Sequence, residues 1–116
     1  LFAYNLLFES LWGDGNSFDV VTDFRYRDRI LAPLSVELDP LISPVGNIAS
    51  ISLSAISSLL SNPTFAANLV AAFTASGRPG TFVAMNDGRD GFQADSDAIL
   101  FLQNYTLSST NFIEFA

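Results

Sequence analysis

Residues 81–102 read TFVAMNDGRDGFQADSDAILFL, and this stretch decides the fold that the sequence predicts. Its two ends are mostly apolar and rich in β-branched and aromatic side chains, which favour strands. Between them lies a polar segment from Asn86 to Asp95, in which Gly88 and Gly91 permit tight turns. The stretch therefore predicts two strands, over residues 81–85 and 98–102, joined by a polar loop.

The flanking sequence extends this β pattern in both directions. Residues 104–111 predict a turn, and residues 112–115 alternate between apolar and polar in a last short strand. Towards the N-terminus, strands are expected over residues 1–8, 18–24 and 30–32. Both ends of the chain are therefore expected to be β-rich.

The middle of the chain predicts a helical insert at about residues 54–76. A first helix is expected after Ser54, with an apolar face made by Ile56, Leu59 and Leu60. A second helix is expected to start at Asn62-Pro63 and to end at Ser76-Gly77, with an apolar face of Phe65, Leu69, Ala72 and Phe73. We expect both helices to pack on the sheet.

These elements predict one mainly β domain over residues 1–116, a β-roll or β-sandwich-like sheet with two short helices packed on it. Its single β core is expected to hold eight residues, namely Phe2, Tyr4, Val21, Phe24, Phe82, Ile99, Phe101 and Phe112. No run approaches the roughly 20 apolar residues that cross a bilayer. Because the chain starts at Leu1, inside a predicted strand, we interpret it as a fragment of a longer protein.

The charge and the missing residue types exclude several functions. Twelve acidic residues face five basic ones, all Arg, for a net charge of −7. This excess repels phosphate backbones, so nucleic-acid binding is not expected. The chain has no Cys and no His, which removes disulfides, thiolate sites and nucleophile pairs that depend on His. The sequence predicts a non-enzyme, and its carboxylates suit a hard cation.

The polar loop is the first candidate calcium site. Calcium takes six to eight oxygen ligands from carboxylates, amides and backbone carbonyls. The loop offers five such side chains, those of Asn86, Asp87, Asp90, Asp95 and Asp97. Its pattern differs from the EF-hand pattern. A solvated loop with Asx-turns, or a carboxylate neutralised by Arg89, is the alternative interpretation.

A second, weaker candidate site consists of Asp14, Asp19, Asp23 and Asp28. On a strand, Asp19, Val21 and Asp23 would lie on one face, with Val20 and Phe24 on the other. The two carboxylates would then be about 7 Å apart and close enough to share an ion. The alternative is that Arg25, Arg27 and Arg29 pair with these carboxylates.

Two sets of motifs carry a family resemblance. The first set resembles the segment that follows the calcium-binding repeats of RTX-type secreted proteins, and consists of Phe2-Ala3-Tyr4, Glu9-Ser10, Gly13-Asp14-Gly15, residues 18–24 and Asp28-Arg29-Ile30. The second set resembles the terminal strands of the same family, and includes Asp97-Ala98-Ile99 and Asn111-Phe112-Ile113. Within it, residues 81–88 and Gly91-Phe92-Gln93, together with the predicted helical segment, are similar to the C-terminal "bluetail" domain of cyanobacterial surface proteins. The sequence lacks a complete RTX nonapeptide.

The resemblance implies a calcium-binding domain that caps a β-roll on a secreted, extracellular or cell-surface protein. It also implies export by a type I secretion apparatus, with an uncleaved signal at the C-terminus. Here the signal residues would be Asn111, Phe112, Ile113, Glu114 and Phe115. The alternative is a structural module whose strand edges pair with identical subunits in a surface layer or fibre, in keeping with the positive mean hydropathy of +0.34.

Overall fold

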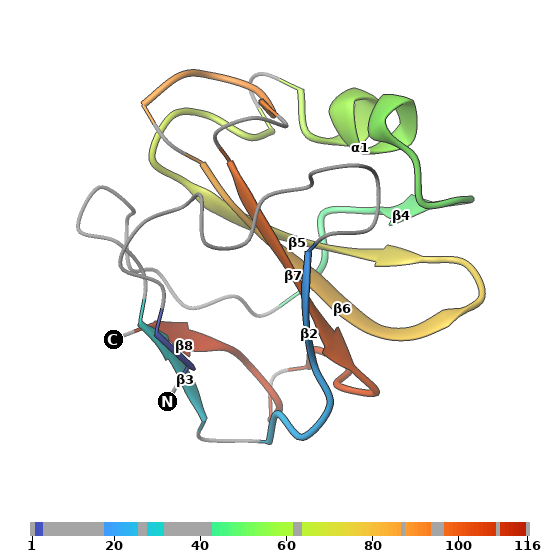
Figure 1. Cartoon of the computed structure of the whole chain (residues 1–116), viewed down its shortest axis with the longest axis vertical. Helices are drawn as coiled ribbons and strands as arrows, with labels where there is room; N and C mark the ends of the chain where they lie inside the picture. The colour runs from blue at the N-terminus through green and yellow to red at the C-terminus, as the bar shows by residue number, and fades with distance from the viewer. Residues whose placement is uncertain are drawn as a thin grey trace.

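The computed structural model describes residues 2–3, 18–25, 28–31, 43–61, 64–86, 88–93, 97–108 and 110–115. The described elements follow one another in Figure 1 as β1 (Phe2–Ala3), β2 (Asp19–Val21), β3 (Arg29–Leu31), β4 (Asn47–Ile48), α1 (Leu53–Leu59), β5 (Val70–Ala75), β6 (Arg78–Met85), β7 (Ala98–Gln103) and β8 (Glu114–Phe115). The predicted mainly β class is confirmed. Residues Tyr4 and Asp14 of the predicted core and site lie outside the described residues.

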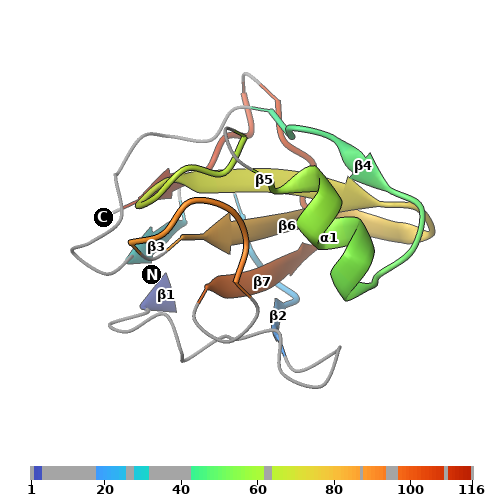
Figure 2. The ribbon, with the colours of Figure 1, turned by 90° about the horizontal axis from the view of Figure 1, so that it is seen from above.

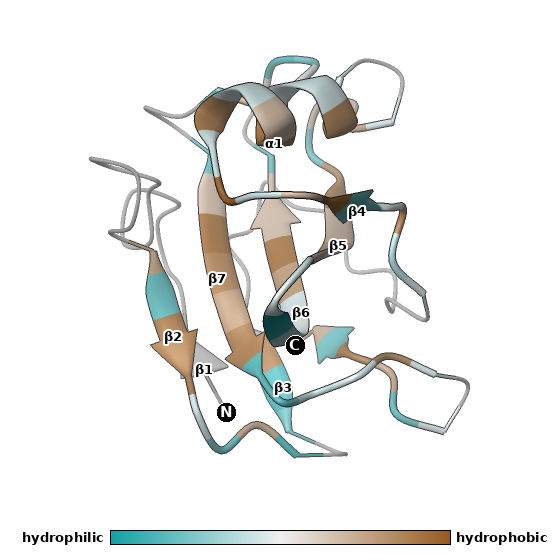
Figure 3. Cartoon of the chain, turned by 90° about the vertical axis from the view of Figure 1, so that its right-hand side faces the viewer, coloured by the Kyte–Doolittle hydropathy of each residue, from teal (hydrophilic) through white to brown (hydrophobic). Residues whose placement is uncertain are grey.

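The two strands predicted from residues 81–102 form the centre of the molecule. β6 and β7 pair antiparallel, with Phe82 opposite Phe101 and Met85 opposite Ala98. Every residue of the two predicted strands is buried, so both faces of the sheet are covered there. A strand covered on both faces carries a continuous apolar run, which is why these segments lack alternation. Figure 3 shows the apolar colour along β6 and β7.

The predicted second helix is wrong, because its second half is strand β5. β5 pairs antiparallel with β6, with Phe73 opposite Phe82. The Ser76-Gly77 pair is a tight hairpin turn rather than the end of a helix, and Gly77 adopts a φ of +80° there. The residues before β5 form turns, in which Asn68 has a φ of +65°. A helix through residues 64–76 is thereby excluded.

The predicted first helix is confirmed as α1. Its N-cap is Ser52 rather than Ser54, since the Ser52 hydroxyl oxygen accepts a hydrogen bond from the backbone N–H of Ala55 at 3.2 Å. Ile56 and Leu60 are fully buried and face the sheet. Figure 2 shows α1 lying over the five-stranded sheet.

The described strands form two sheets. The larger is mixed, in the order β2-β7-β6-β5-β4, and its outer pairs β2–β7 and β4–β5 are parallel. The smaller is parallel throughout, in the order β1-β3-β8, with Ile30 opposite Phe115. The short strands therefore extend the central three-stranded antiparallel unit or form a second layer beside it.

The apolar core is divided by the large sheet, so the predicted single core is wrong. Val21 and Phe24 lie in one cluster, together with Ile30 and Ile113 from the side of the smaller sheet. The opposite face of the large sheet carries the second cluster, which holds Phe18, Ile56, Leu60, Phe65, Phe73, Phe82, Ile99 and Phe101. Phe112 is half-buried, and so is Leu69. The small sheet and α1 therefore cover opposite faces of the large sheet.

A row of stacked rings crosses the face that α1 covers. The ring centroids of Phe73 and Phe82 are 5.0 Å apart, and those of Phe82 and Phe101 are 4.4 Å apart. Phe18 meets Phe82 edge-on at 5.5 Å. Such ring pairs add roughly 0.5–1.5 kcal/mol each beyond the area they bury. They bind β5, β6 and β7 together across the sheet.

Candidate functional site

The polar loop predicted to bind calcium joins the adjacent ends of β6 and β7. Asn86 follows β6 directly and Asp97 precedes β7, and both residues are fully buried. Because Met85 and Ala98 are paired across the two strands, the first and last residues of the loop lie at the same end of the sheet. Two of the five predicted ligands, Asn86 and Asp97, are therefore positioned directly next to the two central strands.

The amide of Asn86 fixes the turn that precedes β5. Its Nδ2 donates to the carbonyl oxygens of Phe65 at 2.9 Å and Ala66 at 3.0 Å, and more weakly to that of Gly91 at 3.4 Å. The backbone N–H of Asn86 donates to the carbonyl of Leu69 at 2.9 Å. These bonds orient the side chain, and its amide nitrogen donates to backbone carbonyls.

The tip of the loop lies on the segment between α1 and β5. The N–H of Gly91 donates to the carbonyl of Phe65 at 2.7 Å, and that of Phe92 to the carbonyl of Leu60 at 3.0 Å. In return, Asp90 Oδ1 accepts from the N–H of Ala67 at 2.9 Å. The described residues of the loop therefore form one hydrogen-bonded unit with Leu60 and residues 65–69 at the end of the sheet.

The end of the loop closes on itself through Gln93. Asp97 Oδ2 accepts from the N–H of Gln93 at 2.7 Å, and the N–H of Asp97 donates to the carbonyl of Gln93 at 2.8 Å. Gln93 Nε2 donates to the carbonyl of Asp90 at 2.9 Å. The side chains of Gln93 and Asp97 are thus both positioned by the loop backbone.

Among the described residues of this unit, two buried side-chain oxygens accept no hydrogen bond. They are Asn86 Oδ1 and Gln93 Oε1, and each belongs to an amide whose nitrogen is already bonded. A buried acceptor without a partner costs roughly 1–3 kcal/mol. A hard cation satisfies such oxygens, and neutral amide oxygens beside carboxylates are the ligands that calcium takes. The two oxygens therefore belong to a ligand class that calcium accepts, while the described residues hold no group of three or more carboxylates around them.

The predicted ligands of this loop differ in their surroundings. Asp97 and Asn86 are buried, whereas Asp90 is exposed and uses Oδ1 to cap Ala67. Asp87 and Asp95 lie outside the described residues. Gln93 was not predicted as a ligand, because a Gln side chain in a polar loop has no spacing that marks it. Its position between two Asp residues was the one available signal.

The second candidate cluster is not assembled in the described part of the chain. Asp19 is exposed on β2, while Asp23 follows the end of that strand. Asp28 Oδ2 accepts from the backbone N–H of Arg25 at 2.9 Å, which closes a turn. No group of three or more carboxylates forms among the residues that the structure describes. The alternation predicted here is also wrong after Val21, since Phe24 shares a cluster with Val21.

Of the arginines predicted to pair with this cluster, Arg29 pairs with a different residue. Arg29 Nε lies 3.3 Å from Glu114 Oε2, across the β3–β8 pair, and both side chains are largely exposed. Arg27 lies outside the described residues. Exposed pairs of this kind contribute about 0–1 kcal/mol.

The predicted export signal is part of the folded domain. The N–H groups of Ser108 and Asn111 donate to each other's carbonyls at 3.1 and 3.2 Å, and Tyr105 Oη donates to the carbonyl of Phe112 at 3.0 Å. Ile113 is fully buried, and Glu114 and Phe115 form β8 beside β3. The Ile113 side chain is therefore accessible only when this end of the chain is unfolded.

Comparison of the chain with protein-family models, with curated proteins and with solved structures finds no match. Among the described residues, no helix has the length and apolar character needed to cross a membrane.

Proposed function

We propose that this chain is a non-catalytic calcium-binding module of an extracellular bacterial surface protein. The observation that supports the proposal is the pair of buried, unpartnered amide oxygens on Asn86 and Gln93, in the loop that also holds the buried Asp97. In the proposed site, these oxygens and the carboxylates of Asp87, Asp90, Asp95 and Asp97 bind one calcium ion.

Calcium fits this loop better than magnesium does. Magnesium demands a tight octahedral geometry and gives up its water reluctantly, while calcium accepts six to eight oxygens in flexible arrangements. The loop offers two amide oxygens and four carboxylates, whereas magnesium usually takes only one or two carboxylates from a protein and keeps several waters. We therefore propose selectivity for calcium.

Bound calcium would stabilise more than the loop. The loop is hydrogen-bonded to Leu60 and to residues 65–69, which lie between α1 and β5. An ion that binds only the folded loop adds its binding free energy to folding of this whole end of the sheet. At low calcium concentration, the loop and the turn bonded to it would therefore be less stable.

The family resemblance and the buried C-terminal segment together support export before folding. A type I signal over residues 111–115 would have to be accessible to the secretion apparatus, yet Ile113 is buried in the folded chain. We propose that the chain stays loosely folded at low cytosolic calcium and folds outside the cell, where it caps a β-roll of the same protein. Calcium would then act as the trigger for folding after export.

Titration calorimetry tests the calcium site directly. The parent chain should bind calcium with a Kd of about 10⁻⁴–10⁻³ M, as extracellular modules do. Gln93→Ala should weaken binding, whereas Gln103→Ala, an exposed Gln at the end of β7, should leave it unchanged. Absence of calcium heat in the parent chain would refute the site.

The alternative function is self-assembly through strand edges. It is favoured by the position of β2 and β4, which are the edge strands of the large sheet among the described strands. These strands have only three and two residues, which limits the backbone pairing that each edge offers. A stable assembly buries well over ~1,000 Å² between copies. A monomer in sedimentation at high protein concentration with calcium would remove this alternative.

A further inference from the structure

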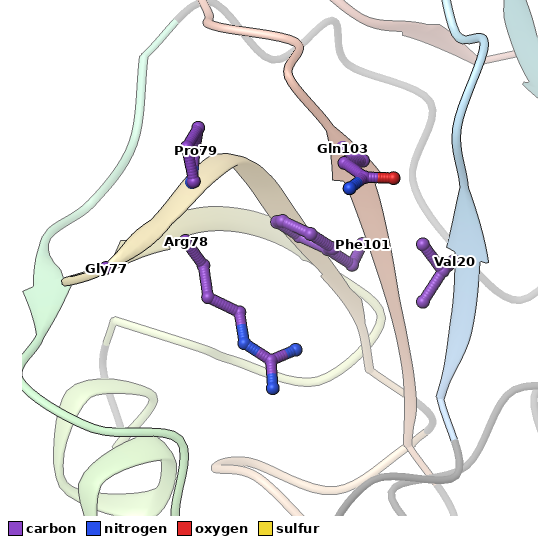
Figure 4. Close-up of a pocket in the computed structure, with 6 residues that line it drawn as sticks. All are labelled: Val20, Gly77, Arg78, Pro79, Phe101 and Gln103. Atoms are coloured by element: carbon purple, nitrogen blue, oxygen red, sulfur yellow. The ribbon is translucent and has the colours of Figure 1, made fainter.

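A pocket of about 290 Å³ opens at the end of the large sheet opposite the polar loop. It is lined by Val20, Gly77, Arg78, Pro79, Phe101 and Gln103 (Figure 4). Phe101 and Gln103 come from β7, Val20 from the edge strand β2, and the others from the β5–β6 hairpin. The pocket lies on the sheet face that carries α1, because Phe101 belongs to the same cluster as Ile56.

The floor of the pocket is the open end of the aromatic row. Phe73 and Phe82 are fully buried, and Phe101 is 5% exposed. The next residue across the sheet is Val20, opposite Phe101 on β2, and it is 50% exposed. The Phe101 ring lies against the backbone at Gly80, where a Cβ would be 2.9 Å from its Cε1 atom. The apolar surface of the pocket therefore comes mainly from Val20, beside the nearly covered Phe101 ring.

The polar groups at the rim suit an anion. Arg78 is the charged residue of the lining, and none of the six lining residues is acidic, in a chain with a net charge of −7. Among the described residues, Arg29 and Glu114 form an ion pair. No described carboxylate forms an ion pair with Arg78. In Figure 4 the Arg78 side chain extends on the same side of the sheet as the Phe101 ring. The side-chain amide of Gln103 adds a second donor at the rim.

We propose that this pocket binds a small organic carboxylate with an aromatic body. The ring covers Val20 and the edge of Phe101, and the carboxylate accepts hydrogen bonds from the Arg78 guanidinium. Apolar contact in a concave site together with a few convergent polar groups is the usual composition of a ligand pocket. A guanidinium binds a carboxylate through two parallel hydrogen bonds, which fixes the orientation of the ligand. The site is independent of the calcium loop.

The proposal is tested by amide chemical shifts of the whole chain during titration with 3-phenylpropionate. The shifts of Val20, Arg78 and Gln103 should saturate with a millimolar Kd, the range expected of a ligand with about eleven non-hydrogen atoms. The neutral 3-phenylpropanol should bind about tenfold more weakly, because it lacks the charge-assisted bonds. Propionate, which lacks the ring, should bind more weakly still.

Two variants test the role of the charge. Arg78→Gln, on an exposed residue, should reduce the affinity for 3-phenylpropionate to that for the alcohol, and the matched Arg89→Gln in the polar loop should not. Val20→Glu should abolish binding by placing a carboxylate in the pocket. The proposal is overturned if no shift saturates, if acid and alcohol bind equally, or if Arg78→Gln binds the acid like the parent chain.

Discussion

The side-chain nitrogen of Asn86 lies 2.9 Å from the carbonyl oxygen of Phe65, a residue 21 positions earlier in the chain. This bond joins the end of β6 to the turn that leads into β5. Asn86 Oδ1 is buried and accepts no hydrogen bond from the part of the chain that the structure describes, and it belongs to a loop rich in Asp. Asn86 therefore links the architecture of the sheet end to the proposed calcium site.

Asn86→Asp should destabilise the chain strongly without calcium. The substitution removes the donor to Phe65 and Ala66 and places a carboxylate oxygen against their carbonyls. Loss of a buried donor costs roughly 1–3 kcal/mol, and the buried charge adds to it. The free energy of unfolding should fall by about 2–4 kcal/mol in urea denaturation. The exposed Asn111→Asp should change it by less than about 0.5 kcal/mol.

Gly80→Ala should cost more than Gly77→Ala. Both glycines have positive φ angles, of +140° and +80°. A Cβ on Gly77 meets no atom within 4 Å, whereas one on Gly80 would lie 2.4 Å from the carbonyl oxygen of Leu102. Gly77→Ala should therefore lower the free energy of unfolding only by the cost of a positive φ at a residue with a Cβ, about 1–2 kcal/mol. Thermal unfolding of the two variants compares them, and equal losses would contradict the close approach of β6 and β7.

Ile113→Ala should show that the C-terminal segment belongs to the core. Ile113 is fully buried with Val21, Phe24 and Ile30. Removal of such a side chain to Ala typically costs 2–5 kcal/mol, measured as the fall in the free energy of unfolding. Thr110→Ala, on an exposed turn, is the control. A neutral effect of Ile113→Ala would mean that residues 111–115 are not held in the fold.

The sequence predicts the centre of this fold well, because there the local pattern and the tertiary structure agree. The apolar runs at residues 81–85 and 98–102 are long, bounded by turn residues and rich in β-branched and aromatic side chains. Their antiparallel pairing buries both faces, as such runs require. The same agreement holds for α1, where a Ser cap precedes an apolar stripe.

The segment around β5 could not be assigned from local pattern alone. Leu69, Ala72 and Phe73 have helical spacing, and the Ala residues favour a helix. Pairing with β6 outweighs this preference, because it supplies hydrogen-bond partners to the backbone of β5 and stacks Phe73 on Phe82. Ser76-Gly77 closes a hairpin as readily as it ends a helix. Only the partner strand distinguishes the two.

The candidate site was predicted in part. Composition pointed to the polar loop, because Asp, Asn and Gly gather there. The buried, unpartnered oxygen of Gln93 depends on where the loop folds back, as the bond from its nitrogen to the carbonyl of Asp90 shows. The pocket at Arg78 was not predicted at all, since its residues come from three separated segments.

The central claim, calcium binding in the 86–97 loop, is tested most directly by the melting temperature in chelator and in about 10 mM calcium. With a Kd of about 10⁻⁴–10⁻³ M, calcium should add roughly 1.5–2.7 kcal/mol. For a domain of this size that is a rise of several degrees. The rise should disappear in the double variant Asp87→Asn with Asp95→Asn and persist in Asp19→Asn with Asp23→Asn. An unchanged melting temperature of the parent chain would contradict the account, and so would equal stabilisation of the parent chain and the loop variant.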